Sequence, residues 1–321
     1  MRYRIAVFAC VAFASSAAAQ VYPSRAITIV VPFAAGGPTD VIARLLSQPM
    51  RAFLGQQVLV ENVTGANGNV GVGKVARAAP DGYTLSIGHW STHVVNGAVY
   101  TLPYDVLKDF EPVSLISTNS YLVVAKNAVP ATDLKSFIAW LKANPDKALE
   151  GTAGAGSPQH VGGIFFQQAT GTRFQFVPYR GAAPAMQALL GGEVDMIIDD
   201  PTSSLPQVRA GKIKAFAVTA KERLAAAPDI PTVDEAGLPK FYFSRWHALW
   251  VPRGTPKDAV MKLNAAVVSA LADREVRTRL SDLGQEIFPR EQQSAAALAA
   301  HHKAEIAKWW PIIKAAGIKA E

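Results

Sequence analysis

The residues best suited to chemistry in this sequence are glycines and hydroxyls that stand between apolar runs and helical patterns. The first set is PFAAGGPTD, residues 32–40, which follows a β-branched run and precedes a helical pattern. Glycine lets a ligand approach the backbone closely, and the N–H groups at a helix start attract anions. Gly36 and Gly37 supply that backbone, and Pro38 suits the first helical position. These residue types predict a site that holds a small anion.

Later loops carry similar residues, each after an apolar run. In an open α/β sheet the ligand sits beyond the carboxyl ends of the strands, where such loops begin. The candidates are Ser91 and Thr92 in GHWSTHVVN, Gly154, Gly156, Ser157 and His160 in GTAGAGSPQH, Tyr179 in VPYRGAAPA, and Asp199 in IIDDPTS. Glycines and hydroxyls dominate, and no base is paired with a nucleophile, so we expect binding of a carboxylate and not its conversion.

An enzymatic alternative uses Ser157, His160 and Asp199 as a hydrolytic triad. Ser157 lacks the G-x-S-x-G elbow, and His160 lies three residues further along the helix, a poor position for a general base. A metal site at His89 and His93 has neither an H-E-x-x-H motif nor an acidic cluster. We therefore expect no enzyme activity, no metal and no cofactor.

The first residues have the pattern of a secretory signal peptide. Arg2 and Arg4 precede an apolar stretch, and small residues lead to a predicted cleavage after Ala19. We assign residues 1–19 to this leader and expect a periplasmic protein. The single cysteine, Cys10, lies in the leader, so the mature chain has no disulfide and no thiolate.

The glycine-rich stretch TGANGNVGVGKV has an alternative interpretation as a phosphate loop. Gly68 to Lys74 fits G-x-x-x-x-G-K, but Val75 stands where a hydroxyl would bind magnesium. An exported chain meets little nucleoside triphosphate, so we favour close packing at a helix start.

The charge of the chain is moderately positive. The formal net charge of +7 falls to +5 when Arg2 and Arg4 are removed with the leader. No run of Lys and Arg is interleaved with aromatic residues, so we expect no nucleic-acid partner. A mild positive field can gather small anions, but ordinary solvated surface charge is the favoured explanation.

The elements that position these loops alternate between strands and helices. The strand-like runs are 26–33, 57–63, 83–88, 120–127, 173–179, 194–199 and 212–220. Helical patterns fall between most of them, including 41–55, which we expect Pro49 to kink or end, and 133–145. The C-terminal third is mostly helical, and we expect His301 and His302 on a solvated face. This order predicts an α/β protein with two sets of mostly parallel strands.

Several separated segments together resemble one family. They are YPSRAITIVVPFAAGGPTDVIARLL, GANGNVGVGKVARAAPDGYTL, STHVVN, GAGSPQH, VPYRGAAPAMQALLGGEVDM and DIPTVDEAGLP. Their order is similar to that of the Bug family, the TctC-like periplasmic substrate-binding proteins of tripartite tricarboxylate transporters. The resemblance covers nearly the whole mature chain.

The resemblance implies a two-lobed periplasmic binding protein fold of the Venus-flytrap kind. Each lobe is a mostly parallel sheet flanked by helices, with two crossover strands near 121–127 and 214–220. The C-terminal helices return to the first lobe. We expect lobe 1 to comprise 20–122 and 223–321, and lobe 2 to comprise 123–222.

The resemblance also implies which residues contact the ligand, mainly through backbone amides, hydroxyls and bridging waters. These are Phe33, Ala35, Gly37, Thr39, Asp40, Trp90, Ser91, Thr92, Gly154, Gly156, Ser157, His160, Tyr179 and Asp199. Trp90 either narrows the cleft and stacks on a flat substrate or packs beneath its loop. Arg180 is a tempting contact, but an arginine is not the family's general rule.

The implied function is capture of a small organic carboxylate: a di- or tricarboxylate, an amino acid or an aromatic acid. The partners would be the membrane permease subunits of a tripartite tricarboxylate transporter. The alternatives are a ligand sensor that feeds a signalling system and a secreted hydrolase. We expect a monomer whose lobes close on the ligand.

Overall fold

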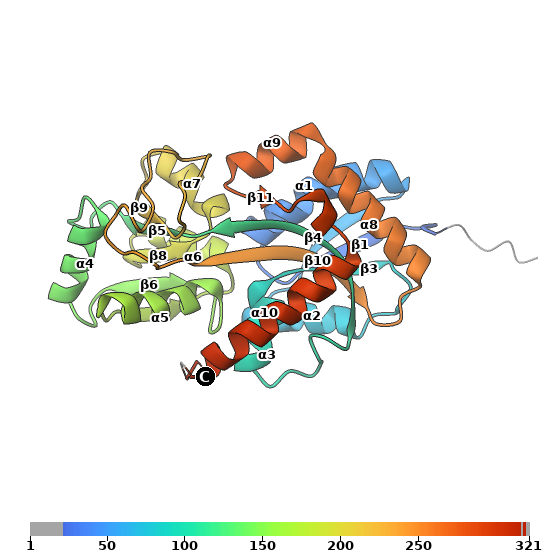
Figure 1. The fold of residues 1–321 in the computed structure, drawn as a ribbon, viewed down its shortest axis with the longest axis horizontal. Helices are drawn as coiled ribbons and strands as arrows, with labels where there is room; N and C mark the ends of the chain where they lie inside the picture. The colour runs from blue at the N-terminus through green and yellow to red at the C-terminus, as the bar shows by residue number, and fades with distance from the viewer. Residues whose placement is uncertain (1–21, 316, 319–321) are drawn as a thin grey trace, which may run out of the picture.

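The computed structural model describes residues 22–315 and 317–318, which form two lobes, each built on one sheet (Figure 1). The expected leader, 1–19, lies outside the described residues. The first sheet has the order β11-β4-β10-β3-β1-β2, with β1 (Ile27–Val31), β2 (Val58–Asn62), β3 (Thr84–His89), β4 (Phe110–Ser120), β10 (Ser244–Pro252) and β11 (Glu286–Ile287). The second has the order β7-β6-β8-β5-β9, with β5 (Leu122–Lys126), β6 (Leu149–Thr152), β7 (Gln175–Pro178), β8 (Met196–Asp199) and β9 (Ile213–Val218).

Both sheets are mixed. β1 pairs in parallel with β2 and β3, and β6 pairs in parallel with β7 and β8. β10 and β5 run antiparallel to both of their neighbours. The predicted two-lobed α/β fold is confirmed, and β11 also pairs antiparallel, with β4.

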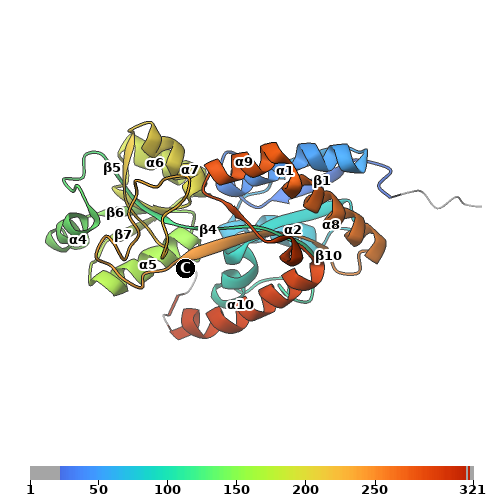
Figure 2. The ribbon, with the colours of Figure 1, turned by 45° about the horizontal axis from the view of Figure 1, so that its top comes forward.

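Helices cover both faces of each sheet. In the first lobe, one face carries α1 (Pro38–Leu54), α8 (Lys257–Ala272) and α9 (Arg274–Asp282), and the other carries α2 (Asn69–Ala76), α3 (Asn96–Val99) and α10 (Ala295–Ala315) (Figure 2). In the second lobe, one face carries α4 (Leu134–Ala143) and α5 (Pro158–Thr170), and the other carries α6 (Ala182–Gly191) and α7 (Pro201–Arg209). Short helical turns are η1 (Ala66–Gly68), η2 (Ser91–Val95) and η3 (Arg290–Gln292).

Helix α1 shows why the local sequence folds as it does. Ile42, Leu46 and Met50 repeat every four residues and are fully buried, so they form the face that packs on the first sheet. We expected Pro49 to kink or end this helix. It does not end it, because α1 continues to Leu54. Pro49 is only partly buried, so the carbonyl that loses its hydrogen bond lies on the side near solvent.

The chain crosses between the lobes at two places. β4 passes through Tyr121 into β5, and the segment after β9 returns through Phe243 into β10. Thr219 joins these crossings: its N–H donates to Tyr121 O at 2.8 Å, and Phe243 N–H donates to Thr219 O at 3.1 Å. The strands expected near 121–127 and 214–220 correspond to β5 and β9.

The segment between β9 and β10 packs with the second lobe. Leu224 and Ile230 are buried in the cluster formed by β5, β8, α6 and α7. We therefore propose that the second lobe extends to the return crossing at Phe243, beyond the boundary at 222 expected from the sequence. The boundary matters because Arg245, just after this crossing, reaches the cleft.

One histidine of α10 is buried. The expectation of a solvated face is wrong for His302, which is 4% exposed and bonds through Nε2 to His93 O at 2.6 Å. Burial lowers the pKa of His302 to about 4, despite this backbone contact. His302 therefore helps to attach α10 to the first lobe.

Candidate functional site

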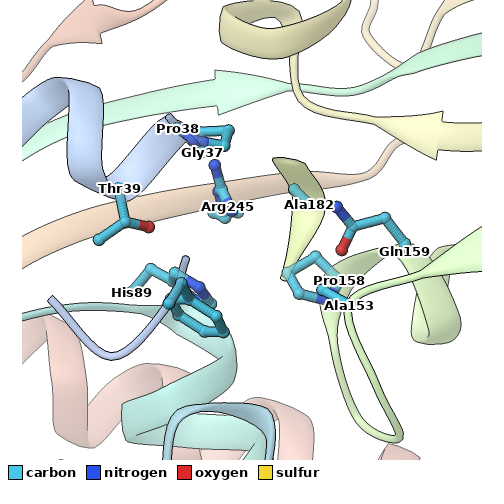
Figure 3. Close-up of a pocket in the computed structure, with 10 residues that line it drawn as sticks. Gly37, Pro38, Thr39, His89, Ala153, Pro158, Gln159, Ala182 and Arg245 are labelled. Atoms are coloured by element: carbon cyan, nitrogen blue, oxygen red, sulfur yellow. The ribbon is translucent and has the colours of Figure 1, made fainter. Parts of the chain in front are cut away.

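A small cavity lies where the start of α1 in the first lobe meets the starts of α5 and α6 in the second (Figure 3). We call it the inner cavity. Its lining combines backbone at helix starts, a few polar side chains and small apolar groups. The lining residues are Phe33, Gly37, Pro38, Thr39, His89, Ala153, Pro158, Gln159, Ala182 and Arg245.

Two helix N-termini face this cavity without a capping side chain. Gly37 is the N-cap of α1 and Gly181 is the N-cap of α6, and neither position has a side-chain cap hydrogen bond. The first N–H groups of a helix have no partner within the helix. The partial positive charges of two helices, one from each lobe, therefore converge on the inner cavity.

Glycine at 181 is required by the close approach of the two lobes. Its φ is +130°, and a Cβ there would lie 3.3 Å from Ala34 N in the first-lobe loop. A larger residue would be strained in this backbone conformation and would push the loops apart. Gly181 thus allows the start of α6 to reach the first lobe.

Arg245 brings a formal positive charge to the inner cavity from β10. Its side chain is 3% exposed and forms an ion pair with Asp200, which is 0% exposed. Burial acts to lower the pKa of Arg245, but Asp200, Tyr121 and Asp199 together outweigh it and the pKa is raised. The guanidinium also lies over the Tyr121 ring, 5.6 Å from its centroid.

His89 and Thr39 are neutral polar groups of the same cavity. Ser91 N–H donates to His89 Nδ1 at 3.1 Å, which assigns the proton of the neutral ring to Nε2. Burial and the charge of Arg245 hold the pKa of His89 well below its usual range, so the ring is neutral near pH 7. Thr39 Oγ1 lies 3.2 Å from His247 Nε2. Both groups can take part in hydrogen bonds to a ligand without adding charge.

Gln159 connects the inner cavity to a buried carboxylate. Its Nε2 donates to Asp199 Oδ1 at 3.3 Å, and its Oε1 has no hydrogen-bond partner among the described residues. Burial, aided by the neighbouring Asp200, raises the pKa of Asp199 to about 7, although hydrogen bonds from Ser203 and Gln159 oppose the rise. Asp199 therefore lies behind the lining and titrates near neutral pH.

A second cavity, the outer cavity, adjoins the first through Phe33 and Ala153, which line both. Its other lining residues are Pro32, Gly65, Ala66, Asn67, Gly68, Tyr100, Gly154, Ala155, Tyr179 and Arg180. Arg180 is exposed here. The outer cavity is thus lined mostly by small residues and carries one solvated cation.

Side chains of the first lobe bridge to the second beside these cavities. Ser91 Oγ donates to Gly156 O at 3.0 Å, and Tyr100 OH donates to Ala155 O. The loop at 154–157 is therefore held against the first lobe. These contacts describe a closed arrangement of the two lobes.

The structure brings several predicted residues to the cavities. Phe33, Gly37 and Thr39 line the inner cavity, and Phe33, Gly154 and Tyr179 line the outer one. Ala35 is exposed and lines neither. Their contact with a ligand stays a prediction.

Other predicted residues organise the loops. Asp40 accepts from Gly36 N–H at 2.8 Å and pairs with Arg44 at 2.9 Å. Hydrogen bonds from Arg44, Gly36 and Asn62 outweigh the effect of burial and lower the pKa of Asp40. Thr92 Oγ1 donates to His89 O at 3.0 Å, which fixes the turn after β3.

Trp90 lines neither cavity. It is 0% exposed and packs edge-on against Phe243 and Trp309, with ring centroids 5.6 and 5.0 Å away. Of the two roles weighed for Trp90, this geometry favours packing beneath the loop, because Trp90 is fully buried against aromatic rings and lines neither cavity.

The residues of the hydrolytic alternative have other partners. Ser157 Oγ accepts from His160 N–H at 3.3 Å as the cap of α5, and His160 Nδ1 accepts from Gly156 N–H at 3.1 Å. Asp199 contacts Gln159 and Ser203. This geometry arranges helix capping and not a base beside a nucleophile. The capped start of α5 also offers an anion fewer open N–H groups than those of α1 and α6.

Sequence reasoning did not include Arg245, Gln159, His89 or Ala182 among the ligand contacts. Gln159 and Ala182 stand in stretches where other residues were the candidates, and His89 was considered only as a metal ligand. Arg245 lies inside the strand pattern SRWHALWVP, where the signal was a charged residue in an apolar β run.

Neither a metal site nor a membrane span is found in 22–315 and 317–318. No cluster of His, Cys, Asp and Glu in these residues could hold a metal ion. No helix among them has the length and hydropathy needed to cross a bilayer.

Comparison with known proteins gives consistent matches. Residues 42–318 match the profile of the tripartite tricarboxylate transporter family receptor. Protein BugT of Bordetella pertussis is 33% identical over 309 residues, which cover 95% of this chain and 94% of BugT. The periplasmic binding protein BugD has a TM-score of 0.90 and 38% identity, over 94% of this chain and 100% of BugD. MatC from Rhodopseudomonas palustris with bound malate has a TM-score of 0.87 and 41% identity, over 91% of this chain and 100% of MatC.

Proposed function

Because the chain belongs to the tripartite tricarboxylate transporter receptor family of periplasmic solute-binding proteins, we propose that its interlobe cleft captures a small organic carboxylate. The acid would be a di- or tricarboxylate, an amino acid or an aromatic acid. We further propose that the chain acts in the periplasm as a monomer and as a binding protein without enzyme activity.

The observation that carries this proposal is the meeting of two uncapped helix N-termini from opposite lobes. The starts of α1 and α6 face the inner cavity together with Arg245, and none of its described lining residues is acidic. Helix N-termini and a guanidinium all favour an anion. Their placement on both lobes means that one anion can contact both halves of the molecule.

Binding across both lobes provides a mechanism for closure. A ligand that contacts α1 and α6 together stabilises the closed arrangement, because the open arrangement separates these contacts. Ser91 and Tyr100, which bridge to the loop at 154–157, add to the stability of the closed form. Malate in the related MatC is a carboxylate of suitable class.

Delivery to the membrane subunits of a tripartite transporter is the proposed next step. A sensor that feeds a signalling system would use the same cavity, so the site alone does not separate the two roles. Uptake into vesicles that hold the cognate permease, with and without this protein, distinguishes them. A transport role predicts uptake that depends on the added protein.

Calorimetric titration tests the carboxylate proposal. The purified chain is titrated with a panel of mono-, di- and tricarboxylates, amino acids and aromatic acids. We expect at least one saturable isotherm, with no loss of the acid over hours by chromatography. Absence of binding across the whole panel overturns the proposal, and turnover of a bound acid overturns the assignment as a binding protein.

A further inference from the structure

Arg245 occupies an unusual position for a charged residue. It lies in β10, the strand that returns from the second lobe. The residues of β10 that follow it, 246–252, are all buried, and most of them are apolar. Figure 3 shows its side chain between the start of α1 and the second-lobe residues Ala182 and Gln159. A charge is rarely buried in a strand unless its electrostatic cost is compensated.

Asp200 supplies part of this compensation and is itself firmly held. One carboxylate oxygen pairs with Arg245. The other accepts from Thr202 N–H at 2.7 Å and from Gln285 Nε2 at 3.3 Å. Because both oxygens have partners, Asp200 is fixed in place and orients the guanidinium from one side.

One further donor of the guanidinium is not satisfied. Arg245 Nε is buried and has no hydrogen-bond partner among the described residues. Arginine presents several donors in a fixed plane, and a buried donor without an acceptor is costly. Gln159, His89 and Thr39 share the inner cavity with it, and all three are uncharged near neutral pH.

We propose that Arg245 is the specificity-determining residue of the inner cavity: its Nε donates to a carboxylate of the ligand, while Asp200 holds the guanidinium from behind. This inference rests on the proposed function and adds the residue and the cavity that recognise the charge. The ligand carboxylate joins an existing ion pair, so Asp200 also limits how strongly the site attracts an anion.

Arg180 is the competing choice for this role. It lines the outer cavity and is exposed, so solvent screens its charge. Arg245 is fully desolvated and held by its partner, so its hydrogen bond to an anion is stronger. If Arg245 recognises the ligand, its substitution by methionine weakens binding more than the same substitution at Arg180.

The test measures affinity by calorimetry for the acid that the carboxylate panel shows to bind tightest. Arg245→Met is expected to weaken binding roughly 10- to 100-fold, the range for a hydrogen bond to a charged group. Asp200→Asn, which keeps a side-chain oxygen to cap α7, is expected to strengthen binding roughly threefold or more because it frees the charge of Arg245. Arg277→Met is the matched control, because it removes one exposed positive charge from the first lobe and is expected to stay within about twofold.

Arg245→Met alone leaves Asp200 buried without its partner, which can unfold the protein. The double variant Arg245→Met with Asp200→Asn removes both charges, so the net charge of the buried pair stays zero. Circular dichroism and thermal melting establish that each variant is folded. The folded double variant is expected to lose binding about as strongly as the single one, roughly 10-fold or more.

A change in the ligand supplies an independent readout. Replacing the bound carboxylate by a carboxamide is expected to weaken binding to the unaltered chain but to have little further effect on the double variant. Equal affinity of the folded double variant and the unaltered chain overturns the inference while leaving the proposed function intact. A larger loss from Arg180→Met than from the double variant also overturns it. If no acid binds the unaltered chain, both proposals fail.

Discussion

The hydroxyl of Ser91 in the first lobe donates a hydrogen bond of 3.0 Å to the carbonyl oxygen of Gly156 in the second lobe. Ser91 also accepts from Asn67 Nδ2 at 2.9 Å, so its position is fixed from its own lobe. The residue that the sequence suggests as a ligand contact thus joins the two lobes directly. Ser91 therefore contributes to ligand binding by stabilising the closed arrangement of the lobes.

Replacing Ser91 with alanine is expected to weaken ligand binding roughly three- to tenfold, because one net hydrogen bond contributes about 0.5–1.5 kcal/mol to the closed form. Calorimetry on the acid that binds the unaltered chain measures the change. Ser47→Ala, which removes a hydroxyl bonded within α1, is the control and should leave affinity unchanged. Unchanged affinity of Ser91→Ala would show that this bond does not favour the bound form.

Trp309 on α10 stacks against Phe165 on α5 across the two lobes, with ring centroids 6.2 Å apart and planes 20° from parallel. Opening of the lobes would separate these rings and expose the indole to water. We expect ligand binding to change tryptophan fluorescence, and we expect Trp309→Phe to remove most of that change. Trp140→Phe is the control, because Trp140 stacks on Phe137 within α4. A signal that survives in Trp309→Phe would place the reporting indole elsewhere.

Much of the fold follows from residues that end one element and start the next. Gly36, Gly37 and Pro38 mark the end of a strand and the start of α1, and their physical preferences apply wherever they occur. Alternating strand and helix patterns give the α/β class for the same reason. The continuation of α1 past Pro49 depends instead on packing of Met50 and Leu54, which the local sequence does not reveal.

The site was less predictable than the fold, because residues that pair within it are distant in the sequence. Arg245 meets Asp200 across 45 positions, and no local pattern reports that pairing. Ser157 was open to a local argument: serine is a favoured N-cap, so it competes with a ligand for the N–H groups of its own helix. The starts of α1 and α6 are better placed for an anion, because glycine provides no capping side chain there.

Ligand affinity is expected to depend on pH through Asp199, whose pKa is raised to about 7 by burial and by Asp200. Asp199 is neutral below that pH and negatively charged above it, and it accepts a hydrogen bond from Gln159, which lines the inner cavity. An anionic ligand should therefore bind more weakly as pH rises from 6 to 8. A repulsion of about 1 kcal/mol corresponds to roughly fivefold.

Calorimetry from pH 6 to pH 8 checks this expectation with Asp199→Asn, which should bind with little change over that range. The control is Asp229→Asn in an exposed position, and it should keep the pH dependence of the unaltered chain. Binding should also take up protons, because a nearby anion raises the pKa of Asp199 further. The same titrations in buffers of different ionisation enthalpy measure that uptake, and a value of zero at pH 7 contradicts the coupling.

Glu150 is a buried acid that should make stability fall as pH rises. It is 0% exposed on β6; Oε1 accepts from Ile198 N–H at 3.1 Å, and Oε2 has no partner among the described residues. Burial holds its pKa well above the ordinary value of 4.5, against the opposing effect of the Ile198 hydrogen bond. The native protein therefore keeps a proton that the unfolded chain releases above about pH 4.5.

Glu150→Gln removes this titration and keeps nearly the same shape. Each pH unit between the unfolded and folded pKa values lowers the free energy of unfolding of the unaltered protein by roughly 1.4 kcal/mol. Urea unfolding should give similar stabilities for the two proteins near pH 4.5 and a more stable variant, by on the order of 1–3 kcal/mol, near pH 7.5. Glu222→Gln, at an exposed position, should follow the unaltered protein throughout. If the curves for Glu150→Gln and the unaltered chain stay parallel at every pH, Glu150 is ionised in the native state and needs a compensating partner within β6, β8 or α5.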